Sequence, residues 1–439
     1  MAPDPFKVHH LHDHPRDTLR IVNGRGPVHD LAVAAGRIVD AHELPSSRRS
    51  LDAAGGLILP AGIDIHTHVL SRGVAIARDH APWVPGPAEA AQAYGRIGYG
   101  LFVDAAVPWH ELTFARQGRA AAQPVEARWL WELDADDEHA AGDPAWLGQR
   151  LHDSEARGVK LVLPVDLGLD AARARIERVA HALAQLDASV KLHVHGPALG
   201  QPGNAGITAE LIRRLDGLPV HLAHLQFHAY ARTPRGRHAS GAQTIAQALD
   251  QADTITADAG CVSFGPAMMV SRDTALARQL GPVVHASPVI RHGWAVLPLE
   301  YRRDNPVHAV QWATGLELML RCQRLQRLSL SVDHPNGGSL LNLPGLLALL
   351  MDADARQHAL AQAHPAARQR TGLATLDREL TLEEALAVTR RAPAAALGLG
   401  DHGRLDVGSI ANLVVTDAIT APPRTLLLAG RVVDLAGLR

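Results

Sequence analysis

Eight short apolar runs are spaced along the middle of the 439-residue chain, and most are separated by stretches with a helical pattern. The runs cover residues 63–69, 101–107, 127–133, 159–165, 190–196, 220–226, 254–260 and 328–334. Residues 171–186 and 309–325 are two of the helical stretches between them. Alternation of strand and helix repeated eight times is typical of a closed parallel barrel with helices around it. We therefore predict an α/β fold, a (β/α)8 TIM-like barrel.

Both ends of the chain have a different pattern, in which short apolar runs are interrupted by turn residues. These runs are TLRIVNG and DLAVAAGRIVDA near the N-terminus, and GRLDVGSIANLVVTD and TLLLAGRVVDL near the C-terminus. Neither end is long enough to enclose a core of its own. We predict that the two ends form one small β-sandwich, which divides the chain into residues 1–58, a barrel over residues 59–398, and residues 399–439.

Composition argues against several classes of partner. The net charge of −2 gives no reason to expect nucleic acid or an anionic membrane, and no apolar run approaches the roughly 18 residues that span a bilayer. The polar N-terminal residues contain no apolar signal core, and the two cysteines, Cys261 and Cys322, lie far apart. We therefore expect no disulfide framework and a cytoplasmic location. The stretch over residues 271–305 is long and rich in proline and glycine, and we expect an active-site loop there.

Lysine is rare in this chain. All but three of the 43 lysine and arginine residues are arginine, and the three lysines are Lys7, Lys160 and Lys191. Lys160 lies inside an apolar run. In a chain that otherwise uses arginine, we expect a lysine there to have a role that arginine could not fill. A buried amine can lose its proton, whereas a guanidinium effectively cannot. A neutral amine can add CO₂ to become a carbamate that bridges two metal ions. Chance survival of three lysines is the alternative explanation.

Histidine is frequent, with 26 residues, and it is the commonest metal ligand in proteins. We expect His9, His10, His12 and His14 to lie on the surface, because they belong to a polar chain end. The active sites of such barrels lie at the carboxyl ends of the strands. The polar residues at or near the ends of the runs are His66, His68, Lys160, His193, His195, His221, His224 and Asp333.

His66 and His68 are two residues apart on one strand, so they point to the same face and can bind one ion together. Neutral imidazoles, a carboxylate and a carbamate are suitable zinc ligands. One His-X-His pair is weak evidence, because buried histidines are more often satisfied by backbone hydrogen bonds. Ligand-type residues on five of the eight strands predict a metal site.

These residues resemble the amidohydrolase superfamily, in the motif GIDIHTH, the lysine on strand four, the histidines on strands five and six and the aspartate on strand eight. Longer stretches resemble one particular branch of this superfamily. KLHVHGPALGQPGN, AHLQFHAY, ADAGCVSFG, VQWATGLEL and VDHPNGG look like the corresponding segments of the A subunit of formylmethanofuran dehydrogenase and of the alpha subunit of bacterial formyltransferase/hydrolase complexes. The resemblance runs from about Leu59 to Asp417.

The resemblance implies two Zn²⁺ ions. His66, His68 and Asp333 would hold the first, His195 and His224 the second, and N6-carboxylated Lys160 would bridge them. His195 is preferred to His193 because it ends its strand directly before a Gly-Pro turn, and His224 is preferred to His221 because it precedes LQFH. His193 and His221 would then support the site or belong to the core.

The resemblance also implies hydrolysis of an N-formyl amide, formyl-methanofuran or formyl-methylofuran, to formate and the free amine cofactor. A hydroxide between the two ions would attack the formyl carbon, and Asp333 would carry its proton to the departing amine. The alternative for Asp333 is a helix N-cap. His228, Asn204 and Asn336 are candidates for substrate contact, and ordering of a loop is the alternative for each.

The partners that the resemblance implies are the other subunits of a formyltransferase/hydrolase-type complex, in one-carbon oxidation linked to tetrahydromethanopterin. Two other functions stay open. A cyclic-amide hydrolase of the hydantoinase or dihydroorotase type would share the metal ligands. A non-catalytic scaffold subunit would keep the fold and bind partners.

Overall fold

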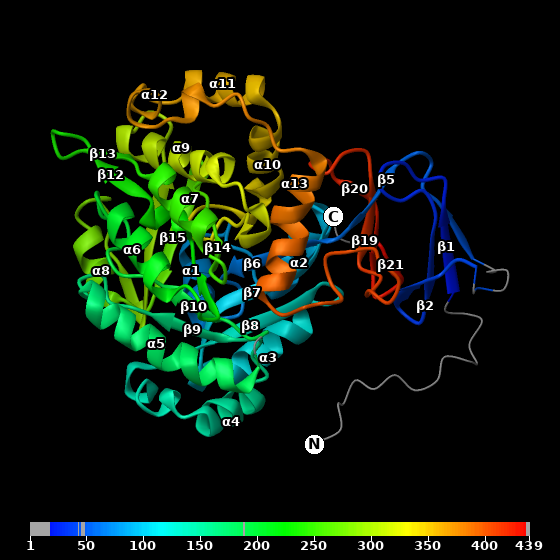
Figure 1. Ribbon diagram of the computed structural model, residues 1–439, viewed down its shortest axis with the longest axis horizontal. Helices are drawn as coiled ribbons and strands as arrows, with labels where there is room; N and C mark the ends of the chain where they lie inside the picture. Colours follow the sequence, from blue (N-terminus) through cyan, green and yellow to red (C-terminus); the bar gives the residue numbers. More distant parts are fainter. Residues whose placement is uncertain (1–17, 43, 45–48, 188, 436–439) are drawn as a thin grey trace.

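The computed structural model describes residues 18–42, 44, 49–187 and 189–435. The predictions for His9, His10, His12 and His14 fall outside these residues. Figure 1 shows a barrel domain with helices around it, and beside it the strands from the two chain ends.

Eight parallel strands form the predicted barrel, which confirms the fold. In spatial order they are β6 (Gly62–Thr67), β7 (Tyr99–Pro108), β8 (Glu126–Glu132), β9 (Val159–Val162), β10 (Leu192–His195), β11 (Val220–Leu222), β14 (Thr256–Asp258) and β18 (Leu328–Ser329). A parallel bridge between Thr67 and His334 joins the two edges of the sheet. Each strand lies within or overlaps one of the eight apolar runs, but the last three are much shorter than their runs.

Helices follow the strands and cover the outside of the barrel (Figure 1). Their bounds are α1 (Arg72–His80), α2 (Pro87–Arg96), α3 (Leu112–Ala121), α4 (Pro144–Ser154), α5 (Leu169–Leu186), α6 (Ala205–Leu215), α7 (Ala242–Gln251) and α9 (Pro306–Arg321). The two helical stretches expected from the sequence correspond to α5 and α9. Helix α9 begins where Asn305 accepts hydrogen bonds from the backbone N–H groups of Val307 and His308, an N-cap followed by proline.

Further helices follow the last strand. They are α10 (Leu343–Met351), α11 (Ala353–Gln362), α12 (Ala366–Arg370), α13 (Leu382–Leu386) and α14 (Ala392–Ala396). Short helical turns are η2 (Trp109–Glu111), η3 (Ala135–Asp137), η4 (Ala140–Gly142), η5 (Leu225–His228), η6 (Leu325–Arg327), η7 (Leu340–Asn342), η8 (Leu373–Thr375) and η9 (Ala387–Arg391).

The β-sandwich has two four-stranded sheets. One contains β3 (Arg37–Val39), β2 (Leu31–Ala34), β1 (Thr18–Val22) and β4 (Ser50–Asp52), and the other β21 (Arg431–Val433), β20 (Pro423–Leu428), β19 (Leu413–Thr416) and β5 (Leu57–Pro60). Ile21 and Val33 of the first sheet share a buried core with Ile58, Leu413 and Leu427 of the second. Both chain ends therefore contribute to it, as the sequence predicts. The residue boundaries of the three segments stay a prediction.

The inner face of the barrel is set by an apolar cluster in which Ile63, Ile65 and Leu130 pack with Ala394 and Leu397. Strict alternation from Ile65 would turn His66 away from this face. The pairing of β6 with β7 is irregular between Asp64 and Thr67, however, and this irregularity brings His66 to the inner side.

The prediction of a loop over residues 271–305 is wrong. More than half of the stretch is regular structure. It contains α8 (Thr274–Leu280) and the strands β16 (Val289–Arg291) and β17 (Trp294–Tyr301), which form an antiparallel sheet with β15 (Gly265–Ser271). Met268 and Trp294 pack against Val74 of α1. Proline and glycine marked its turns, and the burial of alternate residues against α1 was not visible in the sequence. A small hairpin, β12 (Tyr230–Arg232) with β13 (His238–Ser240), follows η5.

Cys261 and Cys322 are both buried and free. Among the helices of the described ranges, none has the length and apolar character needed to cross a membrane.

Candidate metal centre

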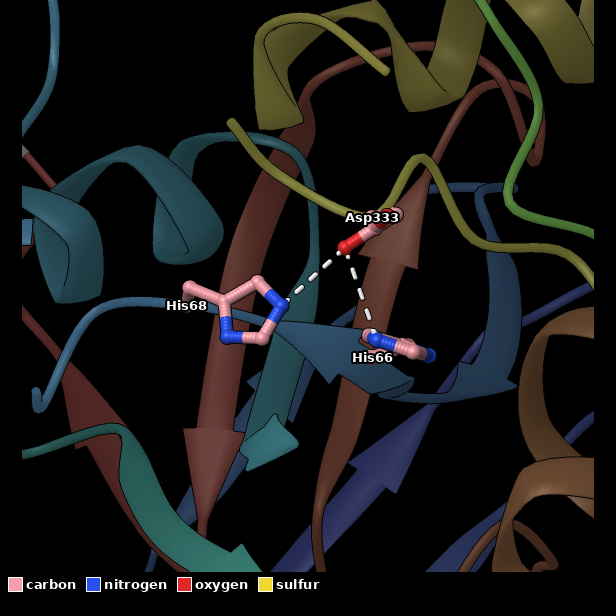
Figure 2. A group of neighbouring side chains, drawn as sticks. All are labelled: His66, His68 and Asp333. Carbon is pink, nitrogen blue, oxygen red and sulfur yellow. Dashed lines mark ion pairs between the residues drawn. The ribbon is translucent and has the colours of Figure 1, made fainter. Parts of the chain in front are cut away.

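Three of the predicted ligands converge at the carboxyl end of the barrel. Figure 2 shows the imidazoles of His66 and His68, from the end of β6, pointing toward the carboxylate of Asp333. The Oδ1 atom of Asp333 lies 3.1 Å from Nε2 of His68 and 3.4 Å from Nε2 of His66. All three side chains are buried, and their candidate ligand atoms lie within 4.8 Å of one another.

These spacings fit a metal ion. Two ligand atoms at about 2.0–2.1 Å from a tetrahedral zinc lie about 3.3 Å apart, close to the two distances from Asp333. Two neutral imidazoles and one carboxylate are also a donor set that zinc accepts. The residues present therefore fit the metal that the sequence predicts at this position.

Lys160 lies in the same interior, on β9, next to Glu132 of β8 and His193 of β10 in the strand register. Its side chain is buried, and its Nζ atom has no hydrogen-bond partner among the described residues. Burial lowers the pKa of this amine, although the charges of Asp258 and Asp333 oppose the shift. A buried amine with a lowered pKa and no partner fits the chemistry of a bridging carbamate. An amine in solvent would have contradicted that role.

His195 and His224 form the second group. Nδ1 of His195 lies 3.0 Å from Nε2 of His224, and the rings of His224 and His66 are 5.2 Å apart. His195 ends β10, whereas His224 lies two residues beyond the end of β11, with a left-handed φ of 38°. The sequence had placed His224 inside the sixth strand, so this detail is corrected.

His193 and His221 occupy other positions. Their rings lie 4.3 Å apart, and His221 is held by Oγ1 of Thr256 at 3.0 Å and by Oδ1 of Asp258 at 3.2 Å. Thr256 and Asp258 both belong to β14. This arrangement fits the supporting role that the sequence reasoning gave to His221.

The sequence reasoning missed buried carboxylates around the site, and Asp258 and Asp104 are among them. Oδ1 of Asp258 lies 3.0 Å from Nδ1 of His66, and its Oδ2 accepts a hydrogen bond from Oγ of Ser331 at 2.6 Å. Asp104 accepts hydrogen bonds from the backbone N–H groups of Val69 and Leu70, directly after His68. Asp258 ends an apolar run, so the same criterion that selected Asp333 could have found it.

Asp258 fixes how His66 presents its ring. A carboxylate beside Nδ1 holds the N–H on that nitrogen and leaves Nε2 with a free lone pair toward Asp333. Burial opposes ionisation of Asp258, but the charges and hydrogen bonds of His66 and His221 outweigh it and hold the pKa of the carboxyl well below its usual range. The carboxylate form is therefore the one present at neutral pH.

His68 differs in protonation from His195 and His224. Burial lowers the pKa of His195 and of His224 well below the usual histidine range, so both are neutral and ready to bind a cation. Burial acts in the same direction on His68. There the hydrogen bonds and charges of Asp104 and Asp333 outweigh it and raise the pKa to about 9. A metal ion at this position must therefore displace a proton from His68.

The three candidates for substrate contact differ in the partners that surround their side chains. The side chain of Asn204 donates to the carbonyls of Ala198 and Phe227 and accepts from the N–H of Tyr230, so it orders the loop after β10. His228 is buried beside His224, their stacked rings 5.5 Å apart, and neither of its ring nitrogens has a hydrogen-bond partner among the located residues. Its ring interacts with the backbone of Pro197, and its contact with substrate stays a prediction.

Asn336 contacts the candidate catalytic group. Its Nδ2 donates to Oδ1 of Asp333 at 3.0 Å, and its Oδ1 accepts from the N–H of Val270 at 2.9 Å. The next helical turn, η7, is capped by Ser339, so Asp333 is not its N-cap. Asn336 therefore orients Asp333, and its contact with substrate stays a prediction.

Comparison with known families matches residues 117–434 to the amidohydrolase family. The chain is 30% identical to the A subunit of the formyltransferase/hydrolase complex Fhc from Methylorubrum extorquens, over 89% of this chain and 81% of that protein. It is 26% identical to protein FwdA from Methanocaldococcus jannaschii, over 91% of this chain and 81% of its relative.

Among solved structures, the chain is similar to the crystal structure of the formyltransferase/hydrolase complex FhcABCD from Methylorubrum extorquens in complex with methylofuran. The TM-score is 0.87 at 27% identity, with 95% of this chain and 88% of that chain covered. An N-acyl-D-glutamate deacylase from Bordetella bronchiseptica, complexed with zinc, shares the fold with a TM-score of 0.54 at 14% identity, over 94% of this chain and 96% of that one.

The variant Asp258→Asn tests the orientation of His66. We expect zinc affinity to fall about 10–100-fold, because an amide no longer holds the imidazole with a charge. Competition with a chromophoric zinc chelator measures this. Asp250→Asn is the matched control, since Asp250 accepts backbone N–H groups of Gln323 and Arg324 away from the site. Unchanged affinity in Asp258→Asn would show that the contact does not matter.

Proposed function

This chain belongs to the amidohydrolase family, and on that premise we propose that it hydrolyses the N-formyl amide of formyl-methylofuran or formyl-methanofuran to formate and the free amine cofactor. The observation that carries the proposal is the convergence of His66, His68 and Asp333 in the same interior as Lys160. The Nζ atom of Lys160 is buried and has no hydrogen-bond partner among the described residues. The likeness to a chain of a formyltransferase/hydrolase complex supports the choice of substrate.

The metal set follows from the donor groups. His66, His68 and Asp333 would hold one zinc ion, His195 and His224 a second, and carboxylated Lys160 would bridge the two. When bound, such a metal pair supplies a Lewis acid for the formyl oxygen and lowers the pKa of the attacking water.

Asp333 carries the proton in this proposal. It accepts the proton of the attacking water and delivers it to the amide nitrogen as the C–N bond breaks, since an amine leaves only when it is protonated. The hydrogen bond from Asn336 holds one carboxylate oxygen and limits rotation of the group. His66 and His68 are almost completely buried, and exclusion of bulk water strengthens each electrostatic contact.

We propose that the chain works with other subunits of a formyltransferase/hydrolase-type complex. The support is the likeness over most of its length to a protein whose solved structure is that of a complex, FhcABCD. A cytoplasmic location remains a prediction from the sequence.

Elemental analysis of the purified complex, together with formate release from formyl-methylofuran, tests the function. We expect about two zinc ions per chain and turnover of the formyl compound. Turnover of hydantoin or dihydroorotate without formate release would favour the cyclic-amide alternative. A metal-free protein that still binds its partners would favour the scaffold alternative.

The variant Lys160→Ala removes the bridging group. We expect loss of bound zinc and of formate release, with partial recovery on addition of short carboxylates that fill the space. Lys191→Ala is the matched control, because Lys191 is a half-buried lysine whose Nζ donates to the carbonyl of Thr254. Full activity of Lys160→Ala without added carboxylate would contradict the bridge.

The variant Asp333→Asn removes the proton carrier and keeps the shape of the side chain. We expect zinc to stay bound and the rate of formate release to fall about 10²–10⁴-fold, the usual share of general acid–base catalysis. Zinc content and turnover are measured on the same preparation. Turnover near that of the unaltered chain would assign Asp333 a structural role only.

A further inference from the structure

Some buried polar atoms around the site are not used by the proposed metal ligands. They are Oε2 of Glu132, both ring nitrogens of His228 and Nε2 of His334, and none has a hydrogen-bond partner within the described ranges. Leaving a buried polar group unsatisfied costs free energy, and the cost is larger when the group is charged. Atoms of this kind at an active site are therefore expected to meet a ligand.

Glu132 is the acidic member of this set. It is the last residue of β8, two residues after Leu130 of the inner apolar cluster, and it pairs in register with Lys160. Its side chain therefore lies on the inner face of the barrel, on the same side as the proposed metal bridge. It is only 5% exposed.

The two oxygens of Glu132 have different surroundings. Oε1 lies 3.5 Å from Nη1 of Arg272, and the same nitrogen donates to Oδ1 of Asp134 at 2.6 Å. Oε2 has no located partner, and neither has Nζ of Lys160, so these two groups do not hydrogen-bond each other. Arg272 thus anchors one oxygen from beside β15 and leaves the other for a donor.

The proposed reaction brings such a donor. A secondary formamide carries one N–H, and hydrolysis breaks the C–N bond, forms a C–O bond and transfers one proton from water to nitrogen. The formic acid formed releases its proton at neutral pH, and the product amine binds it and becomes an ammonium ion beside formate. In the proposed function Asp333 delivers a proton to the lone pair of the nitrogen, and the metal ligands act on the carbon and the oxygens. The N–H of the substrate therefore still needs an acceptor.

We propose that Glu132 is the residue that binds the substrate nitrogen, accepting the amide N–H before the reaction and pairing with the ammonium product after it. This inference rests on the proposed function. Burial raises the pKa of Glu132 to about 7, and an N–H or ammonium donor beside Oε2 favours the ionised form. In that form Glu132 accepts only, whereas a neutral imidazole can donate or accept. Glu132 exchanges no proton in the reaction, and its charge selects amines over neutral compounds of the same shape.

The test uses the zinc-loaded complex and N-(furan-2-ylmethyl)formamide as substrate. Furfurylamine and furfuryl alcohol serve as a charged and a neutral inhibitor of matched shape. In Glu132→Gln we expect inhibition by the amine to weaken at least tenfold, inhibition by the alcohol to change less than twofold, kcat/KM to fall about tenfold and zinc content to stay the same. Asp136→Asn is the control, since Asp136 is an exposed acid only four residues along the chain.

Other outcomes overturn the inference. Equal weakening of both inhibitors would mean that Glu132 only shapes the site, and loss of zinc would mean that it is a metal ligand. If Glu132→Gln does not fold, Glu132→Met, which removes the charge and keeps a side chain of similar length, replaces it, and an unchanged preference for the amine over the alcohol there counts against the inference. If the unaltered complex releases no formate from this probe or from formyl-methylofuran, the proposed function fails. If it releases formate and the variants keep the preference for the amine, only the role of Glu132 fails.

Discussion

One backbone hydrogen bond, from the N–H of His68 to the carbonyl of His334 at 2.7 Å, closes the barrel and sets the site. It joins the first strand to the segment after the last strand, two parts of the chain that are far apart in sequence. Because the closure brings these two segments together, the imidazoles of His66 and His68 meet the carboxylate of Asp333. The ligand cluster is therefore a consequence of barrel closure, and a local motif alone cannot build it.

The site concentrates ionisable groups where water is absent, and such burial costs free energy unless each group is paired. Asp104 and Asp258 are paired, through backbone N–H groups and through His66. Nζ of Lys160 and Nδ1 of His224 have no partner among the located residues. A cation bound between such donors would offset part of this cost. Metal binding and stability of the folded barrel are therefore expected to be linked.

The strands could be predicted from the sequence because burial of both strand faces leaves long apolar runs, and polar residues at their ends were then conspicuous. The roles of those residues were harder to predict. Asp258 and Glu132 also end apolar runs, yet a carboxylate at a strand end looks the same whether it orients a histidine, binds a ligand or faces water. Asn336 was recognised as part of the site, but its partner, Asp333, depends on the turn that joins them.

Two of the proposed ligands, His224 and Asp333, lie farther along the chain than their strands reach, because β11 and β18 are shorter than the apolar runs that predicted them. His224 and Asp333 lie beyond β11 and β18, with left-handed φ values of 38° and 48° that cost residues with side chains about 1–3 kcal/mol. Gly260 permits the first of these turns, since a Cβ there would lie 2.3 Å from Cβ of His224. Continued strands would send both side chains in other directions. The regular strands can therefore vary as long as they bury apolar faces, whereas these two strained turns are tied to the ligands they carry.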